Sequence, residues 1–478
     1  MFLSKKEFVK RVSLVGNNNY TQIFSYFVWL LRKTRLPLLK YNGFFMGALQ
    51  MSMLRTLSKW QKELLTIKKQ FLLNPDEKEK KFLEEKMLIY TEWIRVFQTI
   101  ADGIAWRNLK FNRPVIRLFS ENNSPGYLSQ DYVKVLCSFL NKVPNFVIAN
   151  DLTRCLRVSD LTHILPDGKV LLYEIKKSGK LVKDVKYILN DMRKHKRPFS
   201  KQEIKQWIVQ SSIIDKKIRV PIFENGRVSE ELKAEIVESN FPVSTHFSAI
   251  KKLIREADKS GYAQKEVEPG YYVKVTAYDK MLKGPNADGY FKHIEQDIEN
   301  KPDWLKNPKS KIITLSNYES FIQEEGQYTR NLIPYSVIPF SAKNCIRLMM
   351  GGLSLRIYYN LDVLKEKLEK NGWVVTEVNT TKEESKERNK LYKKEYREAG
   401  NFYKYDLDES LYILTKKDEA GTYKTSLPLT LVLTMMSSMY KSDFLVEGSS
   451  SGFLRAQKSK PKGHNITINF LGEKKVLI

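Results

Sequence analysis

Three side chains with the chemistry of a phosphodiester-cleaving site lie on one short stretch of the sequence. Asp160 precedes a strand-like run, and Glu174 and Lys176 lie on a second run, after the turn Pro166-Asp167-Gly168. Side chains alternate along a strand, so Glu174 and Lys176 share a face, and a closed hairpin brings Asp160 beside Glu174. Two carboxylates supply the oxygen ligands that Mg²⁺ prefers, and the lysine can steady the attacking water or the charge developing at phosphorus.

The Asp/Glu-x-Lys pattern is common in this chain, and its context separates one copy from the others. The other copies lie in charged, helix-like segments, where residues i and i+2 do not face each other, and they begin at Asp76, Glu84, Glu203 and Glu384. Only the copy at Glu174 follows an apolar run and has an aspartate across a turn. The alternative is an exposed strand with ordinary surface charges, but the apolar neighbours of the acids favour a half-buried strand.

With these residues the chain resembles the PD-(D/E)xK nuclease superfamily, which has the restriction-endonuclease-like fold. That fold has a helix, then a small mixed sheet bearing the motif, then a second helix. The resemblance covers roughly residues 100–215. It implies that Asp160 and Glu174 bind Mg²⁺ or Mn²⁺, that the backbone carbonyl of Ile175 is a third ligand, and that Lys176 is the catalytic lysine.

The family pattern also implies further residues, which the sequence leaves open. Asp160 is preceded by Ser159 where the family pattern has proline. Many members carry an additional acid on the preceding helix, and the candidates here are Asp102, which we prefer, Glu121 and Asp131. Some members place a glutamine on the helix after the lysine strand, and the candidates are Gln202, Gln206 and Gln210.

Asp151 is a reserve metal ligand. It follows Asn150 and a strand-like run at 146–149, so a turn role is the simpler reading of this residue.

Basic residues follow the candidate lysine closely. The chain has a net charge of +27, and residues 176–205 contain eleven basic side chains against three acidic ones. Such an excess attracts polyanions, although a solvated helix end and a generally lysine-rich composition are simpler sources for part of it. We predict contacts with nucleic acid from Lys177, Lys180, Lys183, Arg193, Lys194, Lys196 and Arg197.

Composition limits the class of protein. At 478 residues, with 42% hydrophobic and 12% aromatic residues, the chain is expected to fold into two or three domains. Its three isolated cysteines exclude a disulfide framework and cysteine-rich metal sites, and they suit a reducing cytosol. The apolar runs at 23–31 and 427–439 are too short to cross a bilayer, and the N-terminus lacks signal-peptide features. We expect a cytoplasmic protein that does not bind membranes.

The order of predicted elements indicates an α+β multidomain chain. Residues 1–110 are expected to form a helical domain, 111–215 the nuclease core, and 216–478 a mixed α/β region for recognition or oligomerisation. Periodicity predicts helices at 46–73, 82–109, 128–141, 183–195, 201–214, 229–239, 245–259 and 362–370. It predicts strands at 146–149, 161–165, 170–177, 271–278 and 373–378.

The preferred function is Mg²⁺-dependent hydrolysis of nucleic acid, with DNA favoured over RNA. A bacterial defence role, such as antiviral defence, or a genome-maintenance role would suit such an enzyme, acting with a partner protein or as a homo-oligomer. The alternatives are a non-catalytic nucleic-acid-binding protein on a degenerate nuclease fold, and an interaction protein that binds acidic partners. Substitution of Asp160 is expected to stabilise the metal-free protein by relieving repulsion between carboxylates.

Overall fold

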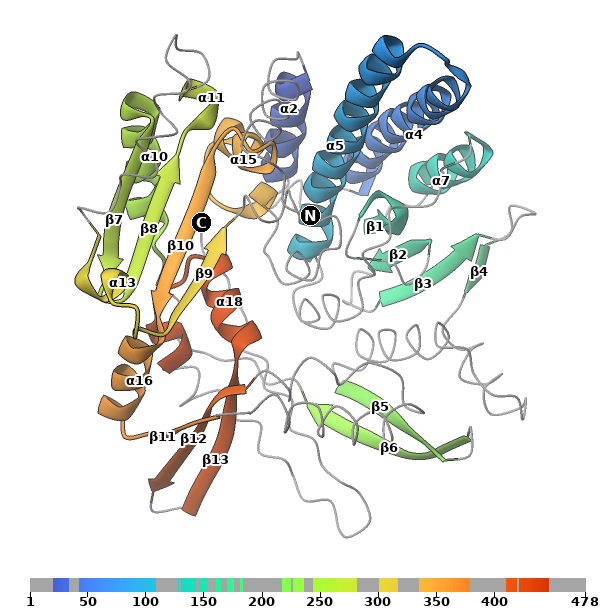
Figure 1. Cartoon of the computed structure of the whole chain (residues 1–478). Helices are drawn as coiled ribbons and strands as arrows, with labels where there is room; N and C mark the ends of the chain where they lie inside the picture. Colours follow the sequence, from blue (N-terminus) through green and yellow to red (C-terminus); the bar gives the residue numbers. More distant parts are fainter. Residues whose placement is uncertain are drawn as a thin grey trace.

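The computed structural model of the chain has a mixed α/β architecture, with helices packed around small antiparallel sheets (Figure 1). It describes residues 20–33, 43–108, 128, 130–142, 146–153, 156, 160–164, 170–175, 181–183, 217–224, 227–235, 244–281, 301–316, 335–378, 410–418 and 421–446.

A long antiparallel helix pair forms the N-terminal part, as the sequence predicts. Helix α4 (Gly43–Leu73) and helix α5 (Glu77–Asn108) lie side by side (Figure 1). The Asp76 carboxylate caps α5 by accepting the Lys78 N–H at 2.9 Å, which satisfies one of the backbone donors left free at a helix start. Aromatic rings fill the space between the helices and α2 (Tyr20–Lys33), where Phe97 lies edge-on to Phe27 with ring centroids 5.0 Å apart.

Helix α7 (Gln130–Lys142) packs against α4 at close range. A Cβ atom on Gly47 of α4 would lie 2.9 Å from the Leu140 carbonyl oxygen of α7, so only glycine allows this approach. The buried face of α7 carries Val133, Leu136, Cys137 and Leu140 at helical spacing. The helix is therefore held against α4 along one side, and Tyr132 is only partly buried.

The first sheet follows α7 and has the strand order β1-β2-β3-β4. Its strands are β1 (Phe146–Ala149), β2 (Leu161–Ile164), β3 (Val170–Ile175) and β4 (Leu181–Lys183). All neighbouring strands in this described part of the sheet are antiparallel, so the expected mixed sheet is not seen there. The short connections explain this, because a parallel pair needs a crossover of a dozen or more residues.

The second half of the described chain is built on another antiparallel sheet, of order β7-β8-β10-β9. Helix α10 (Phe247–Ser260) covers it with Ile250, Leu253, Ile254 and Ala257, which share one helix face. The strands are β7 (Tyr262–Glu268), β8 (Tyr271–Thr276), β9 (Ile312–Ser316) and β10 (Ser354–Asn360).

Shorter elements complete this half of the chain. They are η4 (Tyr335–Val337), α11 (Tyr278–Met281), α13 (Asp303–Lys306), α15 (Ala342–Met349), α16 (Leu361–Lys370) and α18 (Leu429–Ser437). Helix α16 confirms the prediction at 362–370, and Gly372 follows it with a φ of +81°. A three-stranded sheet contains β11 (Val374–Glu377), β12 (Ser410–Asp418) and β13 (Gly421–Pro428).

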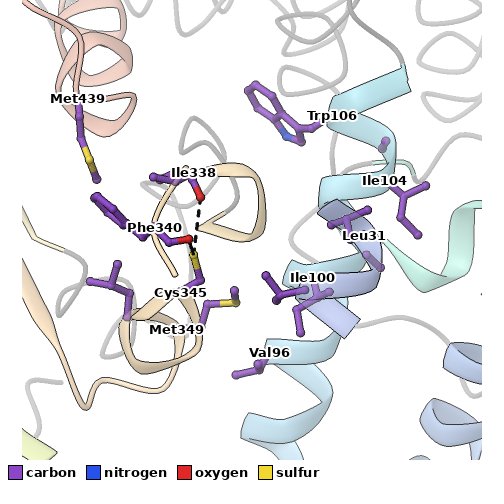
Figure 2. Packing of buried hydrophobic residues seen from close by; sticks show 14 of the residues in the cluster. Leu31, Val96, Ile100, Ile104, Trp106, Ile338, Phe340, Cys345, Met349 and Met439 are labelled. Atoms are coloured by element: carbon purple, nitrogen blue, oxygen red, sulfur yellow. Dashed lines mark hydrogen bonds between the residues drawn. The ribbon is translucent and has the colours of Figure 1, made fainter. Parts of the chain in front are cut away.

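The two halves share one hydrophobic core (Figure 2). Leu31 of α2 and Ile100 of α5 face Met349 of α15, and these side chains are buried. The Arg95 guanidinium also donates a hydrogen bond to the Met349 carbonyl at 2.5 Å, which joins α5 to the end of α15. The helices predicted as a separate domain thus pack directly against elements of the C-terminal region.

One predicted helix is wrong. Residues 229–239 were expected to be helical, but β6 (Arg227–Glu235) pairs with β5 (Lys217–Glu224) in an antiparallel hairpin. The β-branched residues of β5 and the Asn-Gly dipeptide at 225–226 are hairpin signals that outweigh the helix-forming Glu, Leu, Lys and Ala of β6. The helix predicted at 201–214 lies outside the described residues, as does the helix predicted at 183–195 apart from Lys183, which ends β4.

Within the part of the chain that the structure describes, no helix is long and apolar enough to cross a membrane.

Candidate metal site at the β2–β3 hairpin

The predicted hairpin forms between β2 and β3, and Asp160 stands directly before its first paired residue, Leu161. Leu161 pairs with Tyr173 and Thr162 with Leu172, and the Asp160 N–H donates to the Tyr173 carbonyl at 3.1 Å. Glu174 follows Tyr173 on β3, so Asp160 and Glu174 lie at the same end of the hairpin. The side chain of Glu174 lies outside the described part of the structure, as does all of Lys176.

The Asp160 carboxylate is fixed by two hydrogen-bond donors from different elements. Its Oδ2 accepts the backbone N–H of Ile175 on β3, and its Oδ1 accepts the hydroxyl of Tyr132 on α7 at 2.7 Å. Ile175 therefore contributes its N–H to Asp160, next to the carbonyl that the family resemblance nominates as a ligand. Removing the Asp160 carboxylate would leave both donors without this partner. This cost opposes the stabilisation that relief of the repulsion between carboxylates is expected to give.

The same tyrosine brings Asp151 to Asp160. The Tyr132 hydroxyl contacts Oδ2 of Asp151, which lies on the one-turn helix η2 (Asn150–Leu152). Because one hydroxyl contacts both acids, the two carboxylate oxygens are at most about 6 Å apart. Asp151 therefore lies beside Asp160, and it belongs to the candidate site.

Backbone and side-chain hydrogen bonds hold η2 against β2. The Asn150 N–H donates to the Asp160 carbonyl at 2.9 Å, and the Thr162 hydroxyl donates to Asn150 Oδ1 at 2.8 Å. Thr153 closes the turn by donating its hydroxyl to the Asn150 carbonyl at 2.8 Å. Both acids are therefore attached to one rigid corner of the sheet.

Two carboxyl groups and one phenol meet at this corner. Burial, then the negative charge of Asp151 and the hydrogen bonds to both acids, raise the pKa of the Tyr132 hydroxyl well above its usual range, so the phenol is neutral. A phenol has one hydrogen and can donate it to one acceptor at a time. The two carboxyl groups therefore share this one hydrogen.

The donor set fits a hard divalent ion. Asp151 and Asp160 offer carboxylate oxygens at the end of the hairpin that carries Glu174. Oxygen donors of this kind suit Mg²⁺ or Mn²⁺ better than zinc. Among the described side chains, no three His, Cys, Asp or Glu residues form a group able to hold a metal ion. The described part of the site is a carboxylate pair.

The remaining predicted residues have different outcomes. Asp102, the preferred additional acid, is buried on α5. Asp131 faces solvent and forms an exposed ion pair of 3.1 Å with Lys134, so it points away from the site. Lys183 ends β4, with its side chain outside the described residues. Also outside them are Glu121, Gln202, Gln206, Gln210, Lys177, Lys180, Arg193, Lys194, Lys196 and Arg197.

Tyr132 is the site residue that the sequence did not reveal. It lies in a predicted helix, 28 residues before Asp160, and an aromatic residue at a helical position is usually a core residue. No spacing rule connects the middle of a helix to the end of a later strand. Only the packing of α7 beside the sheet shows that this hydroxyl reaches the acids.

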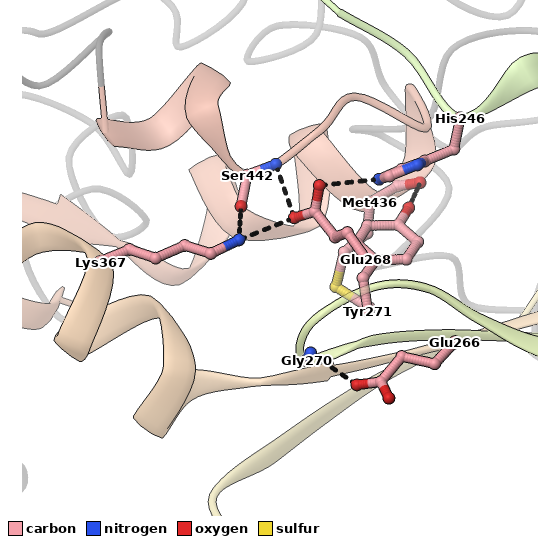
Figure 3. Close-up of polar contacts among 8 residues, drawn as sticks. All are labelled: His246, Glu266, Glu268, Gly270, Tyr271, Lys367, Met436 and Ser442. Atoms are coloured by element: carbon pink, nitrogen blue, oxygen red, sulfur yellow. Dashed lines mark hydrogen bonds and ion pairs between the residues drawn. The ribbon is translucent and has the colours of Figure 1, made fainter. Parts of the chain in front are cut away.

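A second polar cluster, centred on Glu268 at the end of β7, lies in the other half of the chain (Figure 3). Glu268 accepts the Ser442 N–H at 3.1 Å, forms an ion pair of 3.2 Å with Lys367, and lies 3.3 Å from His246. His246 and Ser442 are buried, so this cluster joins chain segments together and is not open to a substrate. We therefore treat it as a structural centre.

Comparison of the chain with protein-family models, with curated proteins and with solved structures found no match. The functional argument therefore rests on the residues and geometry of the candidate site.

Proposed function

We propose that the protein is a divalent-metal-dependent nuclease of the PD-(D/E)xK type that hydrolyses phosphodiester bonds in nucleic acid, preferably DNA. The observation that supports this proposal most strongly is that the β2–β3 hairpin forms and that the N–H of Ile175, the residue after Glu174, donates to the Asp160 carboxylate. A motif that is frequent in a Lys- and Glu-rich sequence is here combined with a paired strand and a second aspartate, Asp151, at the same corner.

The residues of the chain would divide the work as follows. Asp160 and Glu174 would hold Mg²⁺ or Mn²⁺, with the Ile175 carbonyl as a further oxygen donor. When bound, such an ion supplies Lewis-acid stabilisation of the charge that develops on the phosphate oxygens. Lys176 would orient the attacking water or accept its proton, and the Ile175 N–H keeps the Asp160 carboxylate in a fixed orientation.

The net charge of +27 supports a polyanionic substrate. Long-range attraction to phosphate is independent of base sequence and would concentrate nucleic acid at the protein. The basic residues that follow Lys176 in the sequence would then contact the bound nucleic acid. Nucleic acid is thus both the expected binding partner and the expected substrate.

The test is a cleavage assay on single- and double-stranded DNA and RNA, with Mg²⁺, with Mn²⁺ and with EDTA. Asp160→Asn, Glu174→Gln and Lys176→Ala are made singly, and Asp131→Asn is the matched control because its carboxylate is exposed on α7. We expect cleavage only with a divalent ion. Each of the three site variants should lose at least about a hundredfold in rate, and the control should keep the parent rate.

Binding and thermal unfolding of each variant are measured in parallel. Wild-type affinity for DNA together with lost cleavage in the three variants would support the nuclease. Binding without cleavage by the wild type, under every metal condition, would instead identify a non-catalytic nucleic-acid-binding protein. Absence of binding to any nucleic acid at moderate salt would contradict both functions.

A further inference from the structure

Exposed hydrophobic side chains gather where α4 ends and α5 begins, at an outer edge of the structure (Figure 1). The described residues include eight large hydrophobic side chains that are exposed, and four of them lie here. Leu65, Leu72 and Leu73 belong to α4, and Phe82 belongs to α5. Leu72 is 79% exposed and Leu73 is 83% exposed. Ordinary protein surfaces carry such residues singly, so their clustering at one place calls for a binding partner.

Lysines alternate with the leucines on the same face of α4. Residues three and four positions apart are neighbours on a helix surface. At these distances from Leu65, Leu72 and Leu73, every residue of α4 is a lysine or a glutamine. Glu63 is two positions before Leu65 and therefore lies about 160° away around the helix. We define the α4 patch as these leucines together with the exposed lysines between them: Lys62, Leu65, Lys68, Lys69, Leu72 and Leu73.

The α4 patch begins where another chain segment stops covering the helix. The Ser58 hydroxyl donates to the Leu128 carbonyl at 3.1 Å, and Gln61 Oε1 accepts the Leu128 N–H at 3.0 Å. Both of these α4 side chains are buried, whereas the residues of the patch that follow are exposed. Trp60, on another side of the helix, packs against Trp93 of α5 with ring centroids 5.6 Å apart. Helix α4 is thus held by residues outside the patch.

The first turn of α5 differs from the α4 patch in charge. It contains Glu77 and Glu79, and the Asp76 carboxylate caps it. Phe82 is therefore left out of the patch. The partner that the patch fits must meet an outer side of α4, where basic and apolar side chains alternate without an acid.

We propose that the α4 patch binds the surface of an anionic lipid bilayer, with its leucines in the headgroup region and its lysines on the negatively charged headgroups. Such a surface is complementary to both kinds of side chain, because it is negatively charged and it accepts apolar groups below the charge. A lysine can keep its stem along apolar surface while its ammonium group reaches a phosphate. Nucleic acid would use the lysines and leave the leucines in water, so the leucines favour lipid.

This binding surface goes beyond the proposed nuclease activity and does not depend on it. From the sequence we expected no membrane binding because no segment is long enough to cross a bilayer. A helix face can bind at the interface without crossing, so the α4 patch changes that expectation.

Cosedimentation of the full-length chain with vesicles, without metal or nucleic acid, tests the leucines of the patch. Vesicles of phosphatidylcholine alone are compared with vesicles that contain about 30% phosphatidylserine. The variant Leu72→Gln/Leu73→Gln is measured beside Val374→Thr, which changes an exposed hydrophobic residue of β11. Glutamine has nearly the helix propensity of leucine and of lysine, so α4 is retained, and thermal unfolding checks the fold of each variant.

A second pair of variants tests the lysines at constant net charge. One variant carries glutamine at three positions of the patch, Lys62, Lys68 and Lys69. Its control carries glutamine at three exposed lysines on other elements, Lys251, Lys309 and Lys343. Both variants lose the same number of positive charges, so a difference between them is due to position.

We expect the wild type to bind the phosphatidylserine vesicles and to bind phosphatidylcholine alone at least about tenfold more weakly. The leucine variant should lose about tenfold in affinity for the phosphatidylserine vesicles and keep the wild-type affinity for DNA. The patch lysine variant should lose about a hundredfold, since each lysine near an anionic surface contributes about fivefold. Its control should lose at most about threefold, because distant charges are screened, and Val374→Thr should bind like the wild type.

Several results would overturn the proposal. One is a wild type that does not bind the phosphatidylserine vesicles, and another is an equal loss of binding by the two lysine variants. Wild-type vesicle binding by the leucine variant would show that the leucines do not enter the bilayer. Loss of DNA binding by that variant, or loss of a dimer in sedimentation, would instead identify nucleic acid or a second copy of the chain as the partner. Cleavage assays on the variants at Asp160, Glu174 and Lys176 are separate, so the nuclease proposal can fail or stand independently.

Discussion

Gln50 and Val147, which are 97 residues apart in sequence, are joined by a hydrogen bond of 2.6 Å from Gln50 Nε2 to the Val147 carbonyl. Gln50 Oε1 accepts the Ala149 N–H at 2.8 Å, so one side-chain amide satisfies both an acceptor and a donor of β1. Because β1 is the edge strand of its sheet, the amide takes the place of a neighbouring strand. Helix α4 therefore determines where β1 lies and, through β2, where Asp160 lies.

Replacing Gln50 by methionine should destabilise the protein by about 2–4 kcal/mol, because it leaves a buried carbonyl and a buried N–H of β1 without partners. Urea unfolding measures this loss. Gln70→Met is the matched control, since Gln70 is exposed on the same helix, and it should change the free energy of unfolding little. Equal stability of the two variants would show that β1 does not depend on its hydrogen bonds to Gln50.

The Glu268 cluster predicts a loss of stability in acid. Burial raises the pKa of the Glu268 carboxyl, but hydrogen bonds from His246 and Ser442 and the charge of Lys367 outweigh it and lower the pKa to about 2. A carboxyl whose pKa is lowered in the folded state stabilises the protein fully when the pH is above its pKa in the unfolded chain, near 4.5. This stabilisation is lost as the pH falls towards 2. The contribution at neutral pH is about 3 kcal/mol.

Glu268→Gln should therefore lower the free energy of unfolding at pH 7. Between pH 5 and pH 2, about the range set by the two pKa values, the free energy of unfolding of this variant should change less than that of the wild type. Chemical unfolding at a series of pH values measures both quantities. Glu256→Gln is the control, because Glu256 is exposed and only 4.0 Å from Lys252 across one helix turn. Parallel pH profiles for Glu268→Gln and the wild type would contradict the assignment.

Replacing Arg347 on α15 should also strongly destabilise the protein. Its guanidinium makes two hydrogen bonds of 2.7 Å to Asp279 and an ion pair of 2.8 Å to Asp258, and its side chain is 6% exposed. Arg347→Ala leaves both acids without their shared cation and should cost about 3–5 kcal/mol.

The conservative change Arg347→Lys separates charge from geometry. Lysine keeps the positive charge but cannot form the paired bonds to Asp279, so this variant should lose less stability than Arg347→Ala but still measurably more than a surface variant. Lys343→Ala, at an exposed position of α15, is the surface control. Thermal or urea unfolding measures the stability of the three variants. Equal stability of Arg347→Ala and Lys343→Ala would contradict the prediction.

Elements with strong local signals were predictable. The helix pair α4 and α5 has long apolar periodicity and a capping aspartate, Asp76, and both helices form close to their predicted bounds. The β2–β3 hairpin has a turn tripeptide between two apolar runs, and it forms with Leu161 paired to Tyr173. In these cases neighbouring residues determine the structure.

Where local signals conflict, the prediction failed. Residues of β6 have a helix-forming composition, but the partner strand β5 supplies backbone hydrogen bonds along the whole segment. A strand needs a partner that can be distant in sequence, and a window of a few residues cannot evaluate that pairing. The helix propensity of residues 229–239 therefore affects the structure less than the adjacent hairpin signal does.

The sequence by itself determined the chemistry that is available at the candidate site: an aspartate before a strand, a glutamate on the next strand, a lysine two residues after that glutamate, and a large positive charge. Only the tertiary structure decided which other groups join Asp160. Tyr132 and Asp151 reach it because α7 packs on α4 and η2 is fastened to β2, and these contacts depend on side-chain packing between segments that lie far apart along the chain.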